Sequence, residues 1–165
     1  MEVNKFKNDT PLMKAVNEEN FDEVKKILST ANSNINSMGY YGKTALIIAA
    51  EKNNMDLVNL LVDSEAQIDE MDNELKSPLC YAVINNNFEM VSFFLEKGGE
   101  INHPGDESNA PIYEAIESGN LKMVVYLVER GADINKIVNA DYITPYEFAQ
   151  EIDAQEIIDF LKSKL

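Results

Sequence analysis

The sequence is poor in the residues that most often carry covalent, metal or phosphate chemistry. It contains one cysteine, Cys80, which excludes a disulfide within the chain and agrees with a reducing compartment. It contains one histidine, His103, so no pair or triplet of histidines can hold a metal ion. Its seven glycines are scattered and form no glycine-rich loop of the kind that binds phosphate. These absences argue against the commonest catalytic centres, and we expect no cofactor.

Long hydrophobic runs and positive charge are also scarce. No apolar stretch approaches the ~18 residues of a membrane-spanning helix, and the first ten residues, MEVNKFKNDT, lack the apolar segment of a secretory signal. The chain has 14 basic and 29 acidic residues, a net charge of −15, so it repels phosphate backbones. We therefore expect neither a nucleic-acid nor a membrane partner. The negative charge either attracts a basic protein surface or only keeps the chain soluble.

The most informative pattern is a short motif that occurs five times. Its copies are Thr10-Pro11-Leu12, Thr44-Ala45-Leu46, Ser77-Pro78-Leu79, Ala110-Pro111-Ile112 and Thr144-Pro145-Tyr146. The steps between the copies are 34, 33, 33 and 34 residues. A period of this length predicts an array of short supersecondary units, each of which buries its apolar face against its neighbours.

Each unit is predicted to contain two helices. A Thr or Ser followed by Pro is a helix start, because the hydroxyl caps free N–H groups and Pro suits the first helical position. A small residue recurs five positions later, where it allows close helix packing: Ala15, Ala49, Ala82, Ala115 and Ala149. Apolar spacing predicts the second helices around residues 24–28, 58–62, 91–95, 124–128 and 158–161. Asparagine-rich joints at 17–20, 53–54 and 85–87 separate the two helices, where Asn tolerates a left-handed backbone.

These features resemble the ankyrin repeat, whose signature combines T-P-L-H-x-A with a G-A-D-x-N ending. Residues 110–135, with API, Gly119-Asn120 and VVYLVERGADIN, carry the fullest match. The resemblance implies an all-α solenoid of stacked helix-turn-helix units with projecting loops. It implies one domain over residues 1–165, with repeats at about 10–43, 44–76, 77–109, 110–143 and 144–165. The signature His is replaced by Met13, Ile47, Cys80, Tyr113 and Glu147, which puts its usual hydrogen bonds in doubt.

The ends of the array predict polar caps. Lys14 and Lys26 stand near the start where later units have apolar residues, and Gln150 and Gln155 do so near the end. Because terminal units of an array need polar outer faces, we expect a complete domain and a monomer. We expect a cytoplasmic protein, with the terminal Ser163-Lys164-Leu165 as a weak peroxisomal alternative.

The remaining candidates for chemistry are few. Cys80 is interpreted as an apolar filler rather than a reactive thiol, and His103 beside Asp106 as a solvated loop residue. Glu70, Asp72 and Glu74 alternate as weak calcium ligands would, but the EF-hand spacing is absent. We therefore expect that the protein is not an enzyme.

The resemblance implies that the protein binds a partner through its surface. It implies a concave binding face formed by the first helices and by finger loops at 38–43, 71–76, 103–109 and 138–143. Tyr40 and Tyr41 place two amphipathic rings at one loop tip, and tyrosine is enriched among interface hot spots. The predicted partner-binding residues are Tyr40, Tyr41, Lys43, Glu51, Lys52, Asn73, Glu74, Lys76, Ile84, Asp106, Glu107, Asn109 and Glu117.

The expected function is thus a non-catalytic adaptor or inhibitor that binds a protein or peptide, and a partner with a basic surface is one option. Two alternatives remain: a metal-assisted enzyme that uses the acidic loops, and an architectural array that associates with itself.

Overall fold

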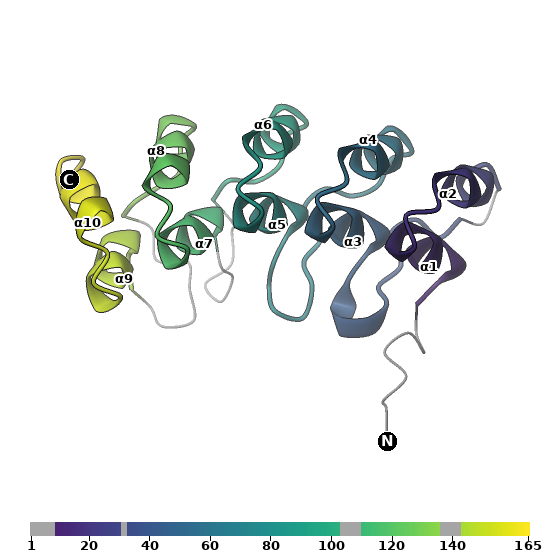
Figure 1. The fold of residues 1–165 in the computed structure, drawn as a ribbon, viewed down its shortest axis with the longest axis horizontal. Coiled ribbons are helices and arrows are strands. Elements are labelled where there is room, and N and C mark those ends of the chain that lie inside the picture. The colour runs from purple at the N-terminus through teal and green to yellow at the C-terminus, as the bar shows by residue number, and fades with distance from the viewer. Residues whose placement is uncertain (1–8, 31–32, 103–109, 136–142) are drawn as a thin grey trace, which may run out of the picture. The chain divides into compact units, whose positions relative to one another are not determined.

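The computed structural model describes residues 9–30, 33–102, 110–135 and 143–165, and this part of the chain is helical without strands (Figure 1). The first-position helices are α1 (Pro11–Asn17), α3 (Ala45–Glu51), α5 (Pro78–Ile84), α7 (Pro111–Glu117) and α9 (Pro145–Glu151). The second-position helices are α2 (Phe21–Leu28), α4 (Met55–Asp63), α6 (Phe88–Glu96), α8 (Leu121–Glu129) and α10 (Gln155–Lys162). A 3-10 turn, η1 (Tyr40–Gly42), lies in the connection between α2 and α3.

All five predicted starts of the first-position helices are confirmed, and local hydrogen bonds explain most of them. The Thr10, Thr44 and Thr144 side chains each accept a hydrogen bond from the backbone N–H three residues later. Ser77 does the same for Cys80. Ala110 caps α7 without a side-chain bond, so there the proline at the first helical position is the remaining local start signal.

The second-position helices begin three residues before the predicted apolar segments. The reason is their N-cap: Asn20, Asn54, Asn87 and Asn120 each accept a hydrogen bond from the N–H three residues on. The left-handed residue in the joint is asparagine only at Asn53 and Asn86. The other three joints use Glu19, Gly119 and Asp153, so the prediction that asparagine supplies this backbone is wrong for the first joint, at 17–20.

The residues that replace the signature His partly substitute for its contacts at the helix start. Glu147 accepts from the Thr144 backbone N–H at 2.8 Å and so closes a capping box. Met13 Sδ accepts weakly from the Thr10 N–H at 3.4 Å. The Tyr113 hydroxyl donates instead to the Ile143 carbonyl at 2.7 Å. The side chains at these three positions therefore still form hydrogen bonds to the backbone, although none of them is histidine.

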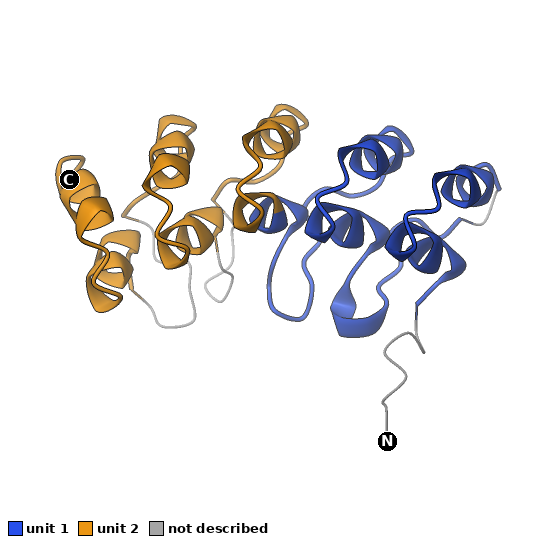
Figure 2. Cartoon of the chain, viewed as in Figure 1, with its two compact units in different colours: residues 1–81 blue, residues 82–165 orange. Residues whose placement is uncertain are grey.

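The chain divides into two compact units, residues 1–81 and 82–165, and the division falls inside α5 (Figure 2). In unit 1, α1 packs against α2 and α3, and α3 packs against α4. In unit 2, α7 packs against α8 and α9, and α10 packs against α8 and α9. The five recurrent alanines on the first-position helices are buried: Ala15, Ala49, Ala82, Ala115 and Ala149. Their small side chains allow the helices to approach closely.

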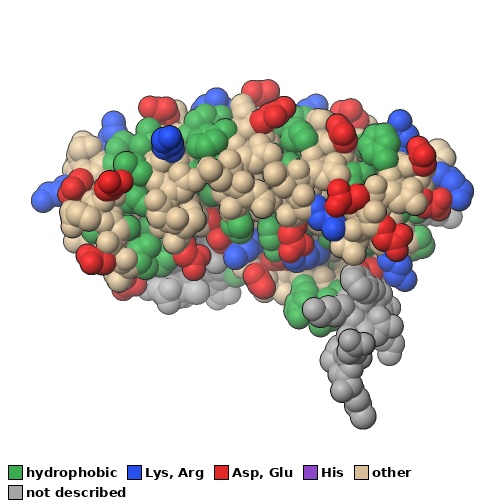
Figure 3. Space-filling model, in the orientation of Figure 1, with side chains coloured by type: hydrophobic (Ala, Val, Ile, Leu, Met, Phe, Trp, Pro, Cys, Tyr) green, Lys and Arg blue, Asp and Glu red, His purple; other side chains and the backbone are tan. Residues whose placement is uncertain are grey.

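The positions predicted as polar caps are exposed. Lys14 on α1 and Lys26 on α2 lie at the surface of unit 1, and Gln150 and Gln155 lie at the surface of unit 2. No helix in the described residues is long and apolar enough to cross a lipid bilayer. On the face shown in Figure 3, acidic and basic side chains are interspersed rather than gathered into one patch.

Candidate functional site

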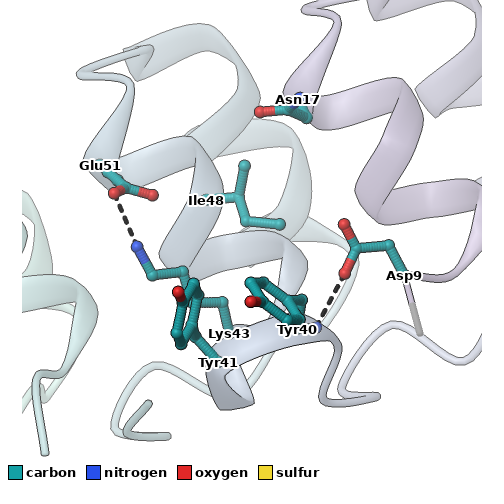
Figure 4. Close-up of a pocket in the computed structure, with 7 residues that line it drawn as sticks. All are labelled: Asp9, Asn17, Tyr40, Tyr41, Lys43, Ile48 and Glu51. Atoms are coloured by element: carbon teal, nitrogen blue, oxygen red, sulfur yellow. Dashed lines mark hydrogen bonds and ion pairs between the residues drawn. The ribbon is translucent and has the colours of Figure 1, made fainter. Parts of the chain in front are cut away.

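The candidate site lies in unit 1, where the connection between α2 and α3 lies beside α1 and α3 (Figure 1). It is a pocket of about 150 Å³, and Figure 4 shows its lining. The lining residues are Asp9, Asn17, Tyr40, Tyr41, Lys43, Ile48 and Glu51. We call it the tyrosine pocket. Four of its residues, Tyr40, Tyr41, Lys43 and Glu51, were among those predicted to bind a partner.

The loop that carries the two tyrosines is held by its own backbone hydrogen bonds. The Gly39 N–H donates to the Lys43 carbonyl at 2.9 Å, and the Gly42 N–H donates to the Gly39 carbonyl at 3.1 Å. Tyr41 has a left-handed backbone, with φ 58° and ψ 20°. This is uncommon for a bulky residue and marks a locally constrained turn. The turn leaves Tyr41 53% exposed, while Tyr40 is half-buried.

The two tyrosine rings contact each other edge to face, with centroids 4.0 Å apart. This arrangement brings the positive edge of one ring to the negative face of the other. A hydrogen bond with Tyr41, together with partial burial, raises the pKa of Tyr40. Both effects favour the neutral hydroxyl of Tyr40 over the phenolate.

Asp9 fixes the loop from outside it. Its Oδ1 atom accepts a hydrogen bond of 2.9 Å from the Tyr40 backbone N–H, 31 residues later in the chain (Figure 4). A Cβ atom at Gly39 would come too close to this oxygen and to Met13 Sδ, so a larger residue there would displace these side chains. Asp9 is not among the residues predicted from sequence, because a single acid ahead of the first helix carries no local signal of this distant contact.

Lys43 and Glu51 form the charged side of the pocket. The Lys43 Nζ atom lies 2.6 Å from Glu51 Oε1 and 4.9 Å from the centroid of the Tyr81 ring. The lysine side chain is only 18% exposed. Because it is held by a carboxylate and by an aromatic face, its ammonium group has a defined position.

A second loop, residues 71–76, adjoins the first within unit 1. The Asn73 N–H donates to the Tyr41 carbonyl at 2.8 Å. Asp72 is 4% exposed, and its Oδ1 accepts from the backbone N–H groups of Glu74 and Lys76. The carboxylate suggested as a weak calcium ligand therefore organises its own loop. Within the described residues, no group of three or more His, Cys, Asp or Glu could hold a metal ion.

The other predicted binding residues are placed as follows. Asn73 and Glu74 are exposed on the second loop, and Lys76 is half-buried and 3.7 Å from Glu74. Lys52 is the C-cap residue of α3, and its Nζ atom lies 3.8 Å from Glu19 Oε1. Ile84, which is 42% exposed, and Glu117 belong to unit 2. Asp106, Glu107 and Asn109 lie outside the described residues, as does His103. That all these residues bind a partner stays a prediction.

Comparison with known proteins agrees with the repeat pattern. A family model described as ankyrin repeats, three copies long, matches residues 1–72 and 66–138. A comparison with curated proteins gave no match. The described helices, in pairs at a period of 33 to 34 residues, fit an all-α ankyrin repeat solenoid. Ankyrin repeats generally act as protein–protein interaction modules and are typically not enzymes. The chain belongs to the ankyrin repeat family.

Proposed function

We propose that this protein is a non-catalytic adaptor or inhibitor that binds a protein or peptide partner through the face of unit 1 that carries the tyrosine pocket. One observation supports this most directly: Tyr40, Tyr41, Lys43 and Glu51 surround a single pocket. These residues come from a projecting loop and from the first-position helix next to it. In ankyrin repeat proteins, which bind protein partners generally, such a surface is suited to a partner.

The pocket combines features that favour strong contacts. Tyr41 and Met38 are 53% and 54% exposed, respectively, so two large side chains are available to a partner. Tyrosine buries a large area and loses little conformational freedom, which is why it is frequent among hot spots. The backbone bonds of the loop and its link to Asn73 hold the rings in place before binding. Such preorganisation lowers the entropic cost of association.

Charge favours a basic partner. The chain carries a net charge of −15, and Glu51 and Glu74 are exposed on the same unit as the pocket. An acidic surface accelerates encounter with a basic one, most strongly at low salt. We therefore propose a protein or peptide with a basic binding surface, and we propose that the free protein is monomeric.

The experiment is affinity capture from native lysate with the wild-type protein and a Tyr40→Ala/Tyr41→Ala variant, followed by calorimetry with the captured partner. If the tyrosines are hot spots, the double variant loses ~2 kcal/mol or more of binding free energy. A Tyr146→Ala variant serves as the matched control, since Tyr146 is a half-buried tyrosine of unit 2. If the double variant binds within about 0.5 kcal/mol of wild type, the proposed face is wrong.

A further inference from the structure

We propose that the tyrosine pocket receives one positively charged side chain, lysine or arginine, of the partner. This inference rests on the proposed function and deepens it, because it states what the pocket itself recognises. Asp9 and Asn17 have side-chain acceptors that no described residue uses, and both residues line the pocket beside the two tyrosine rings.

The first group is the Asp9 carboxylate. Its Oδ1 atom accepts the Tyr40 N–H, but in the described part of the chain Oδ2 accepts no hydrogen bond and Asp9 forms no ion pair. Lys43 does not neutralise it, because that ammonium is held by Glu51 at 2.6 Å. The pocket therefore contains two carboxylates and one ammonium group, with a local excess of one negative charge.

The second group is the Asn17 side chain at the end of α1. It is half-buried and lines the pocket opposite the tyrosine rings (Figure 4). Its amide makes no hydrogen bond to any described residue. An amide oxygen is an acceptor that suits the N–H groups of a guanidinium or an ammonium. Asn17 and Asp9 thus offer two acceptors around one small space.

The walls of the pocket suit the rest of a basic side chain. Ile48, which is 8% exposed, gives an apolar wall against which methylene groups pack. The tyrosine rings offer faces that attract a cation within about 6 Å of the ring centroid. A basic side chain buries its methylene stem against apolar surface and keeps its charge beside acceptors. No other common side chain satisfies the negative charge, the acceptors, the rings and the apolar wall together.

The test uses N-acetyl-arginine amide as the probe and the full chain labelled with nitrogen-15. We expect amide shifts in Asp9, Asn17, Tyr40 and Lys43 that saturate with a Kd on the order of millimolar. N-acetyl-citrulline amide has nearly the same shape without the charge, and it should cause no saturable shift. Asp9→Asn should weaken arginine binding at least about tenfold, since a hydrogen bond to a charged group is lost.

Glu65→Gln is the matched control, because it removes the same charge from an exposed residue that does not line the pocket. It should leave the affinity within about twofold of wild type, since exposed charges at a distance are screened. Equal shifts with citrulline, no shifts with arginine, or equal losses in Asp9→Asn and Glu65→Gln would each overturn the inference. The proposed function is tested separately: partner binding that is weakened in the Tyr40→Ala/Tyr41→Ala variant keeps it, even if the arginine probe does not bind.

Discussion

The hydroxyl of Tyr81 in α5 donates a hydrogen bond of 2.5 Å to Oδ2 of Asp72 in the loop before that helix. Both residues are buried. Burial, followed by the hydrogen bond to Asp72, raises the pKa of Tyr81 above its ordinary value, so the hydroxyl remains a donor at neutral pH. The Tyr81 ring also faces the Lys43 ammonium. One side chain therefore connects the loop at 71–76 with the charged side of the tyrosine pocket.

Tyr81→Phe should destabilise the protein because it removes the donor but keeps the ring. Asp72 Oδ2 would be left buried without its partner, and leaving a buried polar group unsatisfied costs roughly 1–3 kcal/mol. The free energy of unfolding from urea titration measures this loss. Tyr146→Phe is the control, because the Tyr146 hydroxyl makes no hydrogen bond within the described residues. Equal stabilities of the two variants would contradict a structural role for the Tyr81–Asp72 bond.

Gly42→Ala should damage the contact between the two loops of unit 1. Gly42 has φ +72°, and a Cβ atom there would lie 2.4 Å from Asn73 Oδ1 and 3.0 Å from the Asn73 backbone nitrogen. Alanine in a left-handed backbone costs roughly 1–2 kcal/mol by itself, and the clash adds to this cost. Nitrogen-15 spectra should show shifts at Tyr41 and Asn73, because the hydrogen bond between them is displaced.

Gly119→Ala separates the two contributions. Gly119 has a similar φ of +65°, but nothing lies within 4 Å of the added Cβ atom. It should therefore show the backbone cost without the clash, and urea titration should rank Gly42→Ala as the less stable variant. If the two variants unfold at the same denaturant concentration, the Gly42–Asn73 contact contributes nothing measurable.

The helices could be predicted from sequence because their signals are local. Thr44 or Thr144 caps an N–H three residues away, and this bond depends only on the type and position of neighbouring residues. The starts of the second helices were predicted too late, since the apolar spacing begins at Val24 or Val58 whereas the asparagine cap lies four residues earlier. The spacing of apolar residues locates the buried face of a helix, whereas the capping residue sets where the helix begins.

The candidate site could be predicted only in part. Tyr40, Tyr41, Lys43 and Glu51 were found because the repeat pattern assigns them to a loop and to a helix end. Asp9 was missed because its role depends on a contact across 31 residues. Asp72 was interpreted as one of several loop acids, although its neighbours in space bury it. Periodicity indicates which residues share a face, but it does not indicate which buried partner holds a side chain.

Acid should weaken the start of α9 through Glu147. Hydrogen bonds from the Thr144 backbone N–H, and then from its hydroxyl, lower the pKa of Glu147. A carboxylate with a lowered folded pKa adds stability above its unfolded pKa, and this stability is lost as pH falls through the folded value. Carbon-13 titration should give Glu147 a pKa below the ordinary value of about 4.3. Thr144→Ala should move that pKa part of the way back, since only the hydroxyl donor is removed.

The stability of a Glu147→Ala variant provides a second check on the direction in which stability changes with pH. At pH 7 the variant should be less stable than wild type, and the difference should shrink toward zero at acidic pH, as wild-type Glu147 takes up its proton. Urea titrations at both pH values measure the two differences. A difference that stays constant or grows on acidification would contradict the capping role of the ionised carboxylate.

Ala154→Asn should stabilise the protein by supplying the one second-helix cap that the chain lacks. Ala154 stands at the N-cap of α10 and makes no side-chain hydrogen bond. Asparagine fills this position in the other four second helices, at Asn20, Asn54, Asn87 and Asn120. The backbone of Ala154, with φ −82° and ψ 72°, is close to that of Asn120, with φ −88° and ψ 81°. The Ile157 N–H now donates to the Ala154 carbonyl at 3.0 Å, and an asparagine side chain at position 154 would offer this donor a second acceptor, in a shared bond of the kind common at helix ends.

The expected gain is ~1 kcal/mol, the usual difference between asparagine and alanine at an N-cap. Thermal and urea unfolding should both show it, and the slope of the urea transition should stay unchanged because the buried surface is the same. Ala154→Gln is the control, since its longer amide is polar but is not a preferred cap. If glutamine stabilises as much as asparagine, polarity at this partly exposed position explains the gain and the capping bond does not. If neither change raises stability, the prediction is wrong, and the existing bond from the Ile157 N–H to the Ala154 carbonyl already satisfies this end of the helix.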